Sequence, residues 1–262
     1  MTIDTWNPTQ YDKFQREREQ PFYDLLSMIR PSPRMRIVDL GCGTGKLTRE
    51  LHVRMSALDT LGIDRSARML AGQQDEPPTP GLRFAVGTVE WFLGEDDQSY
   101  DLLFSNAVFH WIENHEHLLA RLAAKLAANG QLAFQVPAMH DEASHLVADE
   151  LCDEEPFASA LAGWRRARPV LTPDAYSRLL FRIGFPDPRA ALMVYPHVLA
   201  GPEAVVDWMR GTLLAEYEKR LSPELFTSFV EEYQARLMPR LQATRPFFFP
   251  FKRILCWGQK TN

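Results

Sequence analysis

Val38-Asp39-Leu40-Gly41-Cys42-Gly43-Thr44-Gly45 is the stretch that decides the fold, because a strand pattern and a helix pattern meet there. Before it lies the apolar run 35–40 (MRIVDL), and after it comes 46–55 (KLTRELHVRM), whose apolar residues recur at helical spacing. Glycines at such a turn allow positive φ angles and let a ligand approach the backbone without a Cβ in the way. The following helix offers unpaired N–H groups and the positive end of its dipole. The segment therefore predicts a β-strand, a ligand-binding loop and an α-helix.

The rest of the chain continues this alternation of strands and helices. Further strand patterns occur at 57–63, 82–86, 100–106, 131–137, 190–199 and 247–257. Helical patterns occur at 67–74 (capped by Ser66), at 116–128 (ended by Asn129-Gly130), at 172–183, and at 139–168 and 202–243. Strands that alternate with helices in this way form a parallel sheet with crossover connections. We therefore expect an α/β fold with a seven-stranded, mostly parallel sheet, helices on both faces and a helical cap formed by insertions.

The same patterns divide the chain into consecutive segments. We expect an N-terminal helical lid (1–34), a core that carries the glycine-rich loop (35–137), a helical cap insertion (138–171), a core helix and strand (172–200), a second helical cap insertion (201–244) and the C-terminal strand of the sheet (245–262).

Composition and charge argue against several classes of protein. The net charge of −5 is unlike that of a nucleic-acid-binding protein, which needs a basic face. The first residues are too polar for a signal peptide, and no apolar run is long enough to span a membrane. The three cysteines are scattered and no motif suits a metal ion. We therefore expect a cytoplasmic monomer that binds a small molecule, with no metal, no nucleic acid and no membrane.

The loop differs from the two common phosphate-binding motifs. A Walker A loop needs Ser or Thr after its lysine, whereas Leu47 follows Lys46, and a dinucleotide fingerprint reads GxGxxG where this loop reads GxGxG. Asp39, two residues before the first glycine, would repel a pyrophosphate and suits a cationic amino-acid group. Asp64, at the end of the second predicted strand, can accept two hydrogen bonds from a ribose diol. The spacing thus opposes a nicotinamide-dependent oxidoreductase.

The motifs DLGCGTG (39–45) and GID (62–64) resemble those of class I methyltransferases that depend on S-adenosylmethionine (SAM). The resemblance implies a Rossmann-like sheet with SAM as cofactor and S-adenosylhomocysteine as product. It implies Asp39 near the amino group of SAM, Asp64 on the ribose, and Thr88 where the family usually has an aspartate that binds adenine. The implied cofactor-binding residues are Asp39, Gly41, Cys42, Gly43, Gly45, Asp64, Arg65, Thr88, Val89 and Asn106.

A narrower resemblance, to trans-aconitate 2-methyltransferases, covers almost the whole chain. It is carried by 6–14 (WNPTQYDKF), Glu17-Arg18, Pro21, 106–111 (NAVFHW), 135–137 (QVP) with His145, 206–208 (VDW) and 249–256. It implies methyl ester formation on a small tricarboxylate. The candidate catalytic residues are Tyr11, Asn106 and His110, and the candidate substrate-binding residues are Trp6, Arg18, Arg210, Tyr217 and Arg253.

A carboxylate acceptor would need no general base, because it is already an anion at neutral pH. Catalysis would then consist of orientation, and arginines can hold the other carboxylates of the acceptor in a bidentate manner. The chain departs from the aconitate enzymes at 209–217 (MRGTLLAEY). Two alternatives therefore stay open: methylation of nitrogen, oxygen or carbon in another metabolite, with His110 or His140 as base, and a non-catalytic SAM-binding protein whose cap binds a partner.

Overall fold

The structure of the protein, a computed structural model, describes residues 15–74, 76–95 and 99–261. The chain forms two compact units, which we call the sheet unit and the helical unit and describe one after the other. The sheet unit takes in Arg16–Pro137, Pro169–Met193 and Arg253–Asn262, and the helical unit takes in Ala138–Arg168 and Val194–Lys252.

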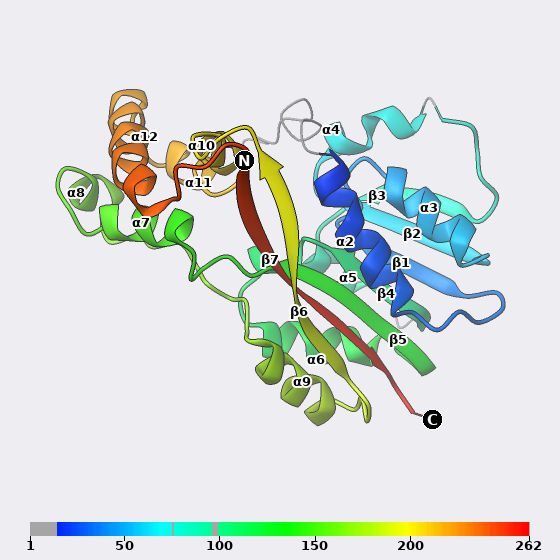
Figure 1. Ribbon diagram of the computed structural model, residues 1–262. Helices are drawn as coiled ribbons and strands as arrows, with labels where there is room; N and C mark the ends of the chain where they lie inside the picture. The colour runs from blue at the N-terminus through cyan, green and yellow to red at the C-terminus, as the bar shows by residue number, and fades with distance from the viewer. Residues whose placement is uncertain (1–14, 75, 96–98, 262) are drawn as a thin grey trace. The chain divides into compact units, whose positions relative to one another are not determined.

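A seven-stranded sheet has the strand order β3-β2-β1-β4-β5-β7-β6 (Figure 1). Its strands are β1 Arg36–Leu40, β2 Asp59–Asp64, β3 Leu82–Val86, β4 Tyr100–Asn106, β5 Leu126–Pro137, β6 Arg189–Leu199 and β7 Phe247–Gln259. β1 pairs in parallel with β2 and β4, β2 with β3, and β4 with β5, whereas β7 runs antiparallel to β5. The expectation of a mostly parallel, seven-stranded sheet is confirmed. The strand order reverses between β1 and β4, where open α/β sheets bind their ligands.

Strand β1 lies near the centre of the sheet because its side chains are largely apolar. Ile37, Val38 and Leu40 are fully buried, as expected of a parallel strand that is covered on both faces. Burial of each such side chain contributes about 1.5–3 kcal/mol to folding. Asp39 is 3% exposed in the same strand. A carboxylate in this position destabilises the fold unless a partner compensates it, so it calls for a functional explanation.

The helices and 3₁₀ turns of the sheet unit connect these strands. They are α2 Gln15–Ser27, α3 Lys46–Arg54, α4 Ala67–Leu70, η1 Ala71–Gln74, α5 Val89–Gly94, η2 Phe109–Trp111, α6 His115–Ala124 and α9 Pro173–Arg182. Ser66 caps α4 as predicted, since its hydroxyl accepts a hydrogen bond from the Met69 N–H at 3.2 Å. Thr172 caps α9, with Pro173 in the first turn.

Two helices of this unit are shorter in the structure than the sequence predicts. The helix expected at 67–74 ends at Leu70 and continues as a 3₁₀ turn. The helix expected at 116–128 ends at Ala124, and β5 begins at Leu126. Leu126 pairs with Tyr100 across an irregularity in the ladder between β4 and β5. Pairing with β4 thus overrides the helical propensity of the alanines that follow, and Asn129, which has a positive φ angle, lies with Gly130 inside the strand instead of at a helix end.

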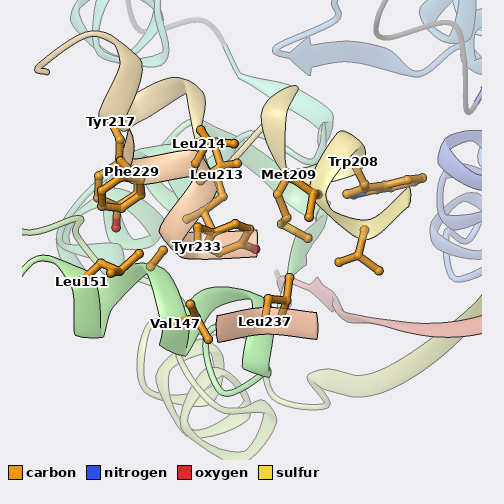
Figure 2. Close-up of a cluster of buried hydrophobic side chains, with 14 of the residues drawn as sticks. Val147, Leu151, Trp208, Met209, Leu213, Leu214, Tyr217, Phe229, Tyr233 and Leu237 are labelled. Carbon is orange, nitrogen blue, oxygen red and sulfur yellow. The ribbon is translucent and has the colours of Figure 1, made fainter. Parts of the chain in front are cut away.

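The helical unit contains short helices around a core of its own. They are α7 Ala143–Leu151, α8 Phe157–Leu161, α10 Ala204–Arg210, α11 Ala215–Glu218, α12 Pro223–Leu237 and the turn η3 Met238–Arg240. Figure 2 shows Val147 and Leu151 of α7 in one cluster with Phe229, Tyr233 and Leu237 of α12. The Tyr233 hydroxyl donates to the Ser144 carbonyl at 2.8 Å, which satisfies the polar end of a buried ring.

The stretches 139–168 and 202–243, expected to be helical, contain several separate helices with non-helical segments between them. Helix α8 ends at Ala162 and Gly163, which both have positive φ angles, and the chain from Arg165 to Leu171 is not helical. Ser222 and Pro223 start a separate helix in the second stretch. Among the described residues, no helix combines the length and apolar character needed to cross a membrane.

Candidate active site

The glycine-rich loop between β1 and α3 has the backbone that its sequence predicts. Gly41, Gly43 and Gly45 have φ angles of 80°, 57° and 76°, in the left-handed region. A Cβ on Gly41 would lie 2.0 Å from Cγ2 of Val108, and a Cβ on Gly45 would lie 2.6 Å from Cε1 of Phe84. The loop therefore has no room for side chains at these two positions.

The loop is tied to the neighbouring strand β2. The N–H groups of Gly41 and Cys42 both donate to the Ile63 carbonyl, at 2.7 and 2.9 Å. The Gly43 N–H donates to Oδ2 of Asp64 at 2.8 Å, and the Ser66 N–H donates to Oδ1 at 2.9 Å. Each carboxylate oxygen of Asp64 keeps a further lone pair that a ribose hydroxyl can use. Asp64 thus fixes the loop and can also accept from a ligand.

Asp39 lies beneath this loop as an incompletely satisfied carboxylate. The Thr48 hydroxyl donates to Oδ2 at 2.6 Å, while Oδ1 is buried and has no hydrogen-bond partner among the described residues. Burial raises the pKa of Asp39 to about 7, although the bond from Thr48 lowers it; the nearby Asp64 adds a smaller increase. A cationic amino group at Oδ1 would supply the missing partner. The orphaned oxygen and the glycine backbone therefore fit SAM.

The other predicted cofactor residues surround the loop. Burial, with smaller contributions from Asp39 and Asp64, raises the pKa of Cys42, which keeps its side chain a neutral thiol. Arg65 is exposed directly after Asp64. Thr88 is the N-cap of α5, where its hydroxyl accepts from the Trp91 N–H at 3.1 Å, and Val89 is buried. The hydroxyl of Thr88 keeps its own hydrogen to donate, so an adenine contact through Thr88 stays a prediction.

A line of hydrogen-bonded side chains crosses three neighbouring strands. Nη1 of Arg253 in β7 donates to Oε1 of Gln135 in β5 at 3.1 Å. Nε2 of Gln135 donates to Oδ1 of Asn106 in β4 at 2.7 Å. Arg253 is 5% exposed and Gln135 is fully buried. The structure thus brings together two predicted residues, Asn106 and Arg253, through a third whose role sequence reasoning missed.

This polar line lies beside the glycine-rich loop. Val108, two residues after Asn106, contacts Gly41, and the Ser105 hydroxyl donates to the Leu40 carbonyl at 2.9 Å. The signal in the sequence was a glutamine inside the otherwise apolar segment 132–136 (LAFQV). The sequence contains no comparable indication for Thr48, whose hydroxyl donates to Asp39, because a threonine within a helix does not by itself indicate a function.

The histidines that follow β4 have different environments. His110 is half-buried in η2, with its ring centroid 4.6 Å from that of Trp111, which is exposed. His115 is buried: Nδ1 lies 2.6 Å from the Tyr176 hydroxyl and Nε2 lies 2.9 Å from the Phe109 carbonyl. Burial lowers the pKa of His115, so it holds η2 in place as a neutral ring. The catalytic role of His110 stays a prediction.

Two further predicted residues, Arg210 and Tyr217, have different environments in the helical unit. Arg210 is exposed at the end of α10. Tyr217 is fully buried, with its ring stacked on Phe229 at 4.7 Å between centroids. Figure 2 shows both rings inside the hydrophobic cluster. Packing accounts for the burial of the Tyr217 ring, and its substrate contact stays a prediction.

The remaining predicted residues belong to the N-terminal segment. Trp6 and Tyr11 lie outside the described residues, and the description of Arg18 is limited to its backbone in α2. The described ranges contain no group of three or more His, Cys, Asp or Glu side chains that would hold a metal ion.

Comparisons with known proteins agree with this geometry. A family model described as a methyltransferase domain matches residues 38–134. The trans-aconitate 2-methyltransferase of Deinococcus radiodurans is 40% identical over 257 residues, which cover 96% of this chain and 96% of that protein.

Two solved structures illustrate the shared fold. The YcgJ protein from Bacillus subtilis has a TM-score of 0.62 at 14% identity, over 93% of this chain and 99% of that chain. The phosphoethanolamine N-methyltransferase 2 of Haemonchus contortus, solved with phosphomonomethylethanolamine and S-adenosylhomocysteine, has a TM-score of 0.54 at 13% identity, over 93% of this chain and 53% of that chain. At these identities the likeness shows the fold.

The loop, the orphaned carboxylate and the nearly full-length relatives lead to one assignment. The cofactor is SAM, the acceptor is a small molecule, and the enzyme is a transferase and neither an oxidoreductase nor a non-catalytic binding protein. The chain belongs to the SAM-dependent methyltransferases, in the family that includes the trans-aconitate 2-methyltransferases.

Proposed function

We propose that the protein methylates a carboxylate of trans-aconitate and forms its methyl ester. The relatives that cover nearly the whole chain carry the name trans-aconitate 2-methyltransferase. The observation that carries the proposal is the buried guanidinium of Arg253, linked through Gln135 to Asn106 beside the glycine-rich loop. A buried cation at the ligand-binding edge of the sheet favours an acceptor that is an anion.

The residues of this edge have separate tasks in the proposal. Asp39 accepts from the amino group of SAM, and Asp64 accepts from its ribose. When bound, SAM supplies a methyl group that is activated by a sulfonium. Arg253 holds a carboxylate of the acceptor, and Gln135 fixes the orientation of both Arg253 and Asn106.

Proton transfer is not required for this reaction. A carboxylate oxygen of the acceptor forms the new O–CH₃ bond while the S–CH₃ bond breaks, and the electron pair of that bond goes to sulfur. The acceptor loses one negative charge and the sulfonium loses its positive charge, so the products are an ester and S-adenosylhomocysteine. Since the carboxylate is ionised at neutral pH, orientation and exclusion of water suffice, and orientation alone can contribute roughly 7–11 kcal/mol.

Turnover with defined acceptors tests the proposal. The protein is incubated with SAM and, separately, trans-aconitate, a simple phenol and a primary amine, and S-adenosylhomocysteine is measured by chromatography. We expect turnover with trans-aconitate and a product that alkali hydrolyses as an ester. Turnover with the phenol or the amine, and none with trans-aconitate, would contradict the proposed acceptor and favour a base-assisted methyl transfer.

A further inference from the structure

The side chains of Arg253, Gln135 and Asn106 form a line in which the direction of each hydrogen bond is determined. The guanidinium of arginine has only N–H donors, so the Gln135 atom that lies 3.1 Å from Nη1 of Arg253 is the acceptor oxygen. The other end of the Gln135 amide is then the nitrogen, and the Asn106 atom 2.7 Å from it is an oxygen. Arg253 thus fixes the orientation of two amides in succession.

These bonds leave the amide nitrogen of Asn106 for a ligand. Oδ1 of Asn106 accepts from Gln135, whereas Nδ2 has no hydrogen-bond partner among the described residues. Asn106 is half-buried at the end of β4, so its amide is within reach of a bound molecule. Gln135 is fully buried with both ends of its amide bonded, and a flip of this amide would break both bonds. Asn106 therefore turns its N–H donors, and not its oxygen, away from Gln135.

Asn106 lies at the ligand-binding edge of the sheet. Strands β1 and β4 are parallel neighbours, so the glycine-rich loop after β1 and the residues after β4 lie at the same edge. Val108, two residues after Asn106, packs against Gly41 of that loop. The backbone leaves β4 at Ala107, which has a φ angle of 61° and whose N–H donates to the Gln135 carbonyl at 3.0 Å. The donors of Asn106 and the glycine-rich loop are thus neighbours within the sheet unit.

The polarity of Asn106 suits one class of methyl acceptor. An amine carries N–H groups, which an oxygen of the enzyme must accept if the lone pair of the amine is to face the methyl group. A carboxylate has lone pairs only, and it is ionised at neutral pH. One of its oxygens can accept from Nδ2 while the other stays free to react. The donors of Asn106 therefore favour a carboxylate and disfavour an amine.

We propose that Asn106 binds the reacting carboxylate of the acceptor through Nδ2, and that Arg253 and Gln135 set this polarity and thereby select carboxylates over amines. The inference rests on the proposed function for its substrate class. One oxygen of the carboxylate accepts from Asn106, and the other forms the O–CH₃ bond while the S–CH₃ bond breaks and its electron pair goes to sulfur. Asn106 touches the acceptor, whereas Gln135 is a positioning residue.

The variant Gln135→Glu reverses the polarity and tests the proposal. Both oxygens of a glutamate are acceptors, so one would accept from Arg253 and the other from Nδ2 of Asn106, which would turn Oδ1 of Asn106 towards the acceptor. We expect kcat/KM for trans-aconitate, at saturating SAM, to fall by roughly 100-fold or more. Gln135→Leu removes both bonds without reversing them and should cost less, on the order of tenfold. If Gln135 only supported the fold, the order would be opposite, because glutamate keeps both bonds and leucine keeps neither.

A double-mutant cycle separates the polarity from the charge that the glutamate adds. In an Asn106→Ala background, Gln135→Glu should change kcat/KM by less than about threefold, because no amide remains to be turned. An equal loss in both backgrounds means that the charge acts directly on the acceptor, and it overturns the inference. Asn129→Asp is the matched control, since it adds the same charge to β5 at an exposed position, and its kcat/KM should equal that of the wild type.

A second variant covers the case in which Gln135→Glu does not fold, which thermal melting shows. Asn106→Asp keeps the shape of the side chain and the bond from Gln135, but it offers an oxygen where the wild type offers N–H donors. It should also lose roughly 100-fold in kcat/KM for trans-aconitate. Turnover by folded Asn106→Asp at the rate of the wild type overturns the inference.

The choice of acceptor separates this inference from the proposed function. If the wild type methylates succinate or benzoate but not trans-aconitate, the proposed acceptor is wrong, and the same variants test the polarity with that carboxylate. If the wild type methylates trans-aconitate and Gln135→Glu loses less than Gln135→Leu, the proposed function stands and the inference is overturned. Turnover with a primary amine and with no carboxylate overturns both, as does a complete lack of turnover with carboxylates.

Discussion

Replacement of Asp39 by Asn should change the stability of the ligand-free protein and its affinity for SAM in opposite directions. The folded protein holds the pKa of Asp39 at about 7, against a reference value of 3.8. Between these two pH values the native state keeps a proton that the unfolded state has lost, so stability falls as pH rises through this window. The full shift corresponds to about 4 kcal/mol, and the part lost between pH 5 and pH 8 is about 2–3 kcal/mol.

Asp39→Asn removes this titration while it keeps an oxygen for the hydroxyl of Thr48. Chemical denaturation at pH 5 and pH 8 measures the effect. Relative to the wild type, the variant should gain about 2–3 kcal/mol of unfolding free energy between the two pH values. This difference does not depend on any constant penalty from the new amide, because such a penalty is the same at both pH values.

The same substitution should weaken SAM binding strongly, because the ammonium loses its carboxylate partner. In the wild type, SAM pairs with the ionised form, so its affinity should fall by about tenfold from pH 8 to pH 6. Asp187→Asn is the control, since the Asp187 side chain is 78% exposed. The reasoning is refuted if Asp39→Asn loses as much stability between pH 5 and pH 8 as the wild type, or if it binds SAM with unchanged affinity.

Three other substitutions test the loop, the polar line across the sheet and the packing of Tyr217. Gly41→Ala should abolish measurable SAM binding and lower the melting temperature, because its Cβ would lie 2.0 Å from Cγ2 of Val108 at a positive φ; normal binding would show that the loop adapts. Gln135→Leu should lower kcat/KM for the acceptor at least tenfold while the Kd of SAM changes little, since it breaks the link between Asn106 and Arg253; equal kinetics would remove the positioning role. Tyr217→Phe should leave the KM of the acceptor within about twofold, as the ring keeps its packing on Phe229, and a large rise in KM would support Tyr217 as a substrate ligand.

Sequence reasoning predicted the parts of the structure that depend on local chemistry. The strand β1, the glycine-rich loop and the cap at Ser66 follow from apolar runs, positive φ angles and a short polar side chain. These features depend on neighbours within a few residues, so one sequence is sufficient to find them.

The errors arise where residues distant in sequence decide the outcome. The alanines before Asn129 favour a helix, yet pairing of Leu126 with Tyr100 in β4 turns their start into strand. Tertiary pairing overrides propensity there. The packing of the Tyr217 ring on Phe229 of the next helix likewise depends on a residue outside the stretch 209–217, so the sequence alone did not reveal it.

The site shows the same division between local and distant information. Asp39 and Asp64 are recognisable because their positions relative to the glycines are fixed by the strand–loop–helix geometry. Gln135 acts only through Asn106 and Arg253, 29 positions before it and 118 after it in the chain.

A crystal structure of the protein with S-adenosylhomocysteine would show whether the glycine-rich loop binds the cofactor. We expect the amino group of the ligand to donate to Oδ1 of Asp39, the ribose hydroxyls to donate to Asp64, and the backbone of Gly41–Gly45 to lie against the amino-acid end. Saturating ligand that binds elsewhere, or that leaves Oδ1 of Asp39 without a partner, would contradict this expectation.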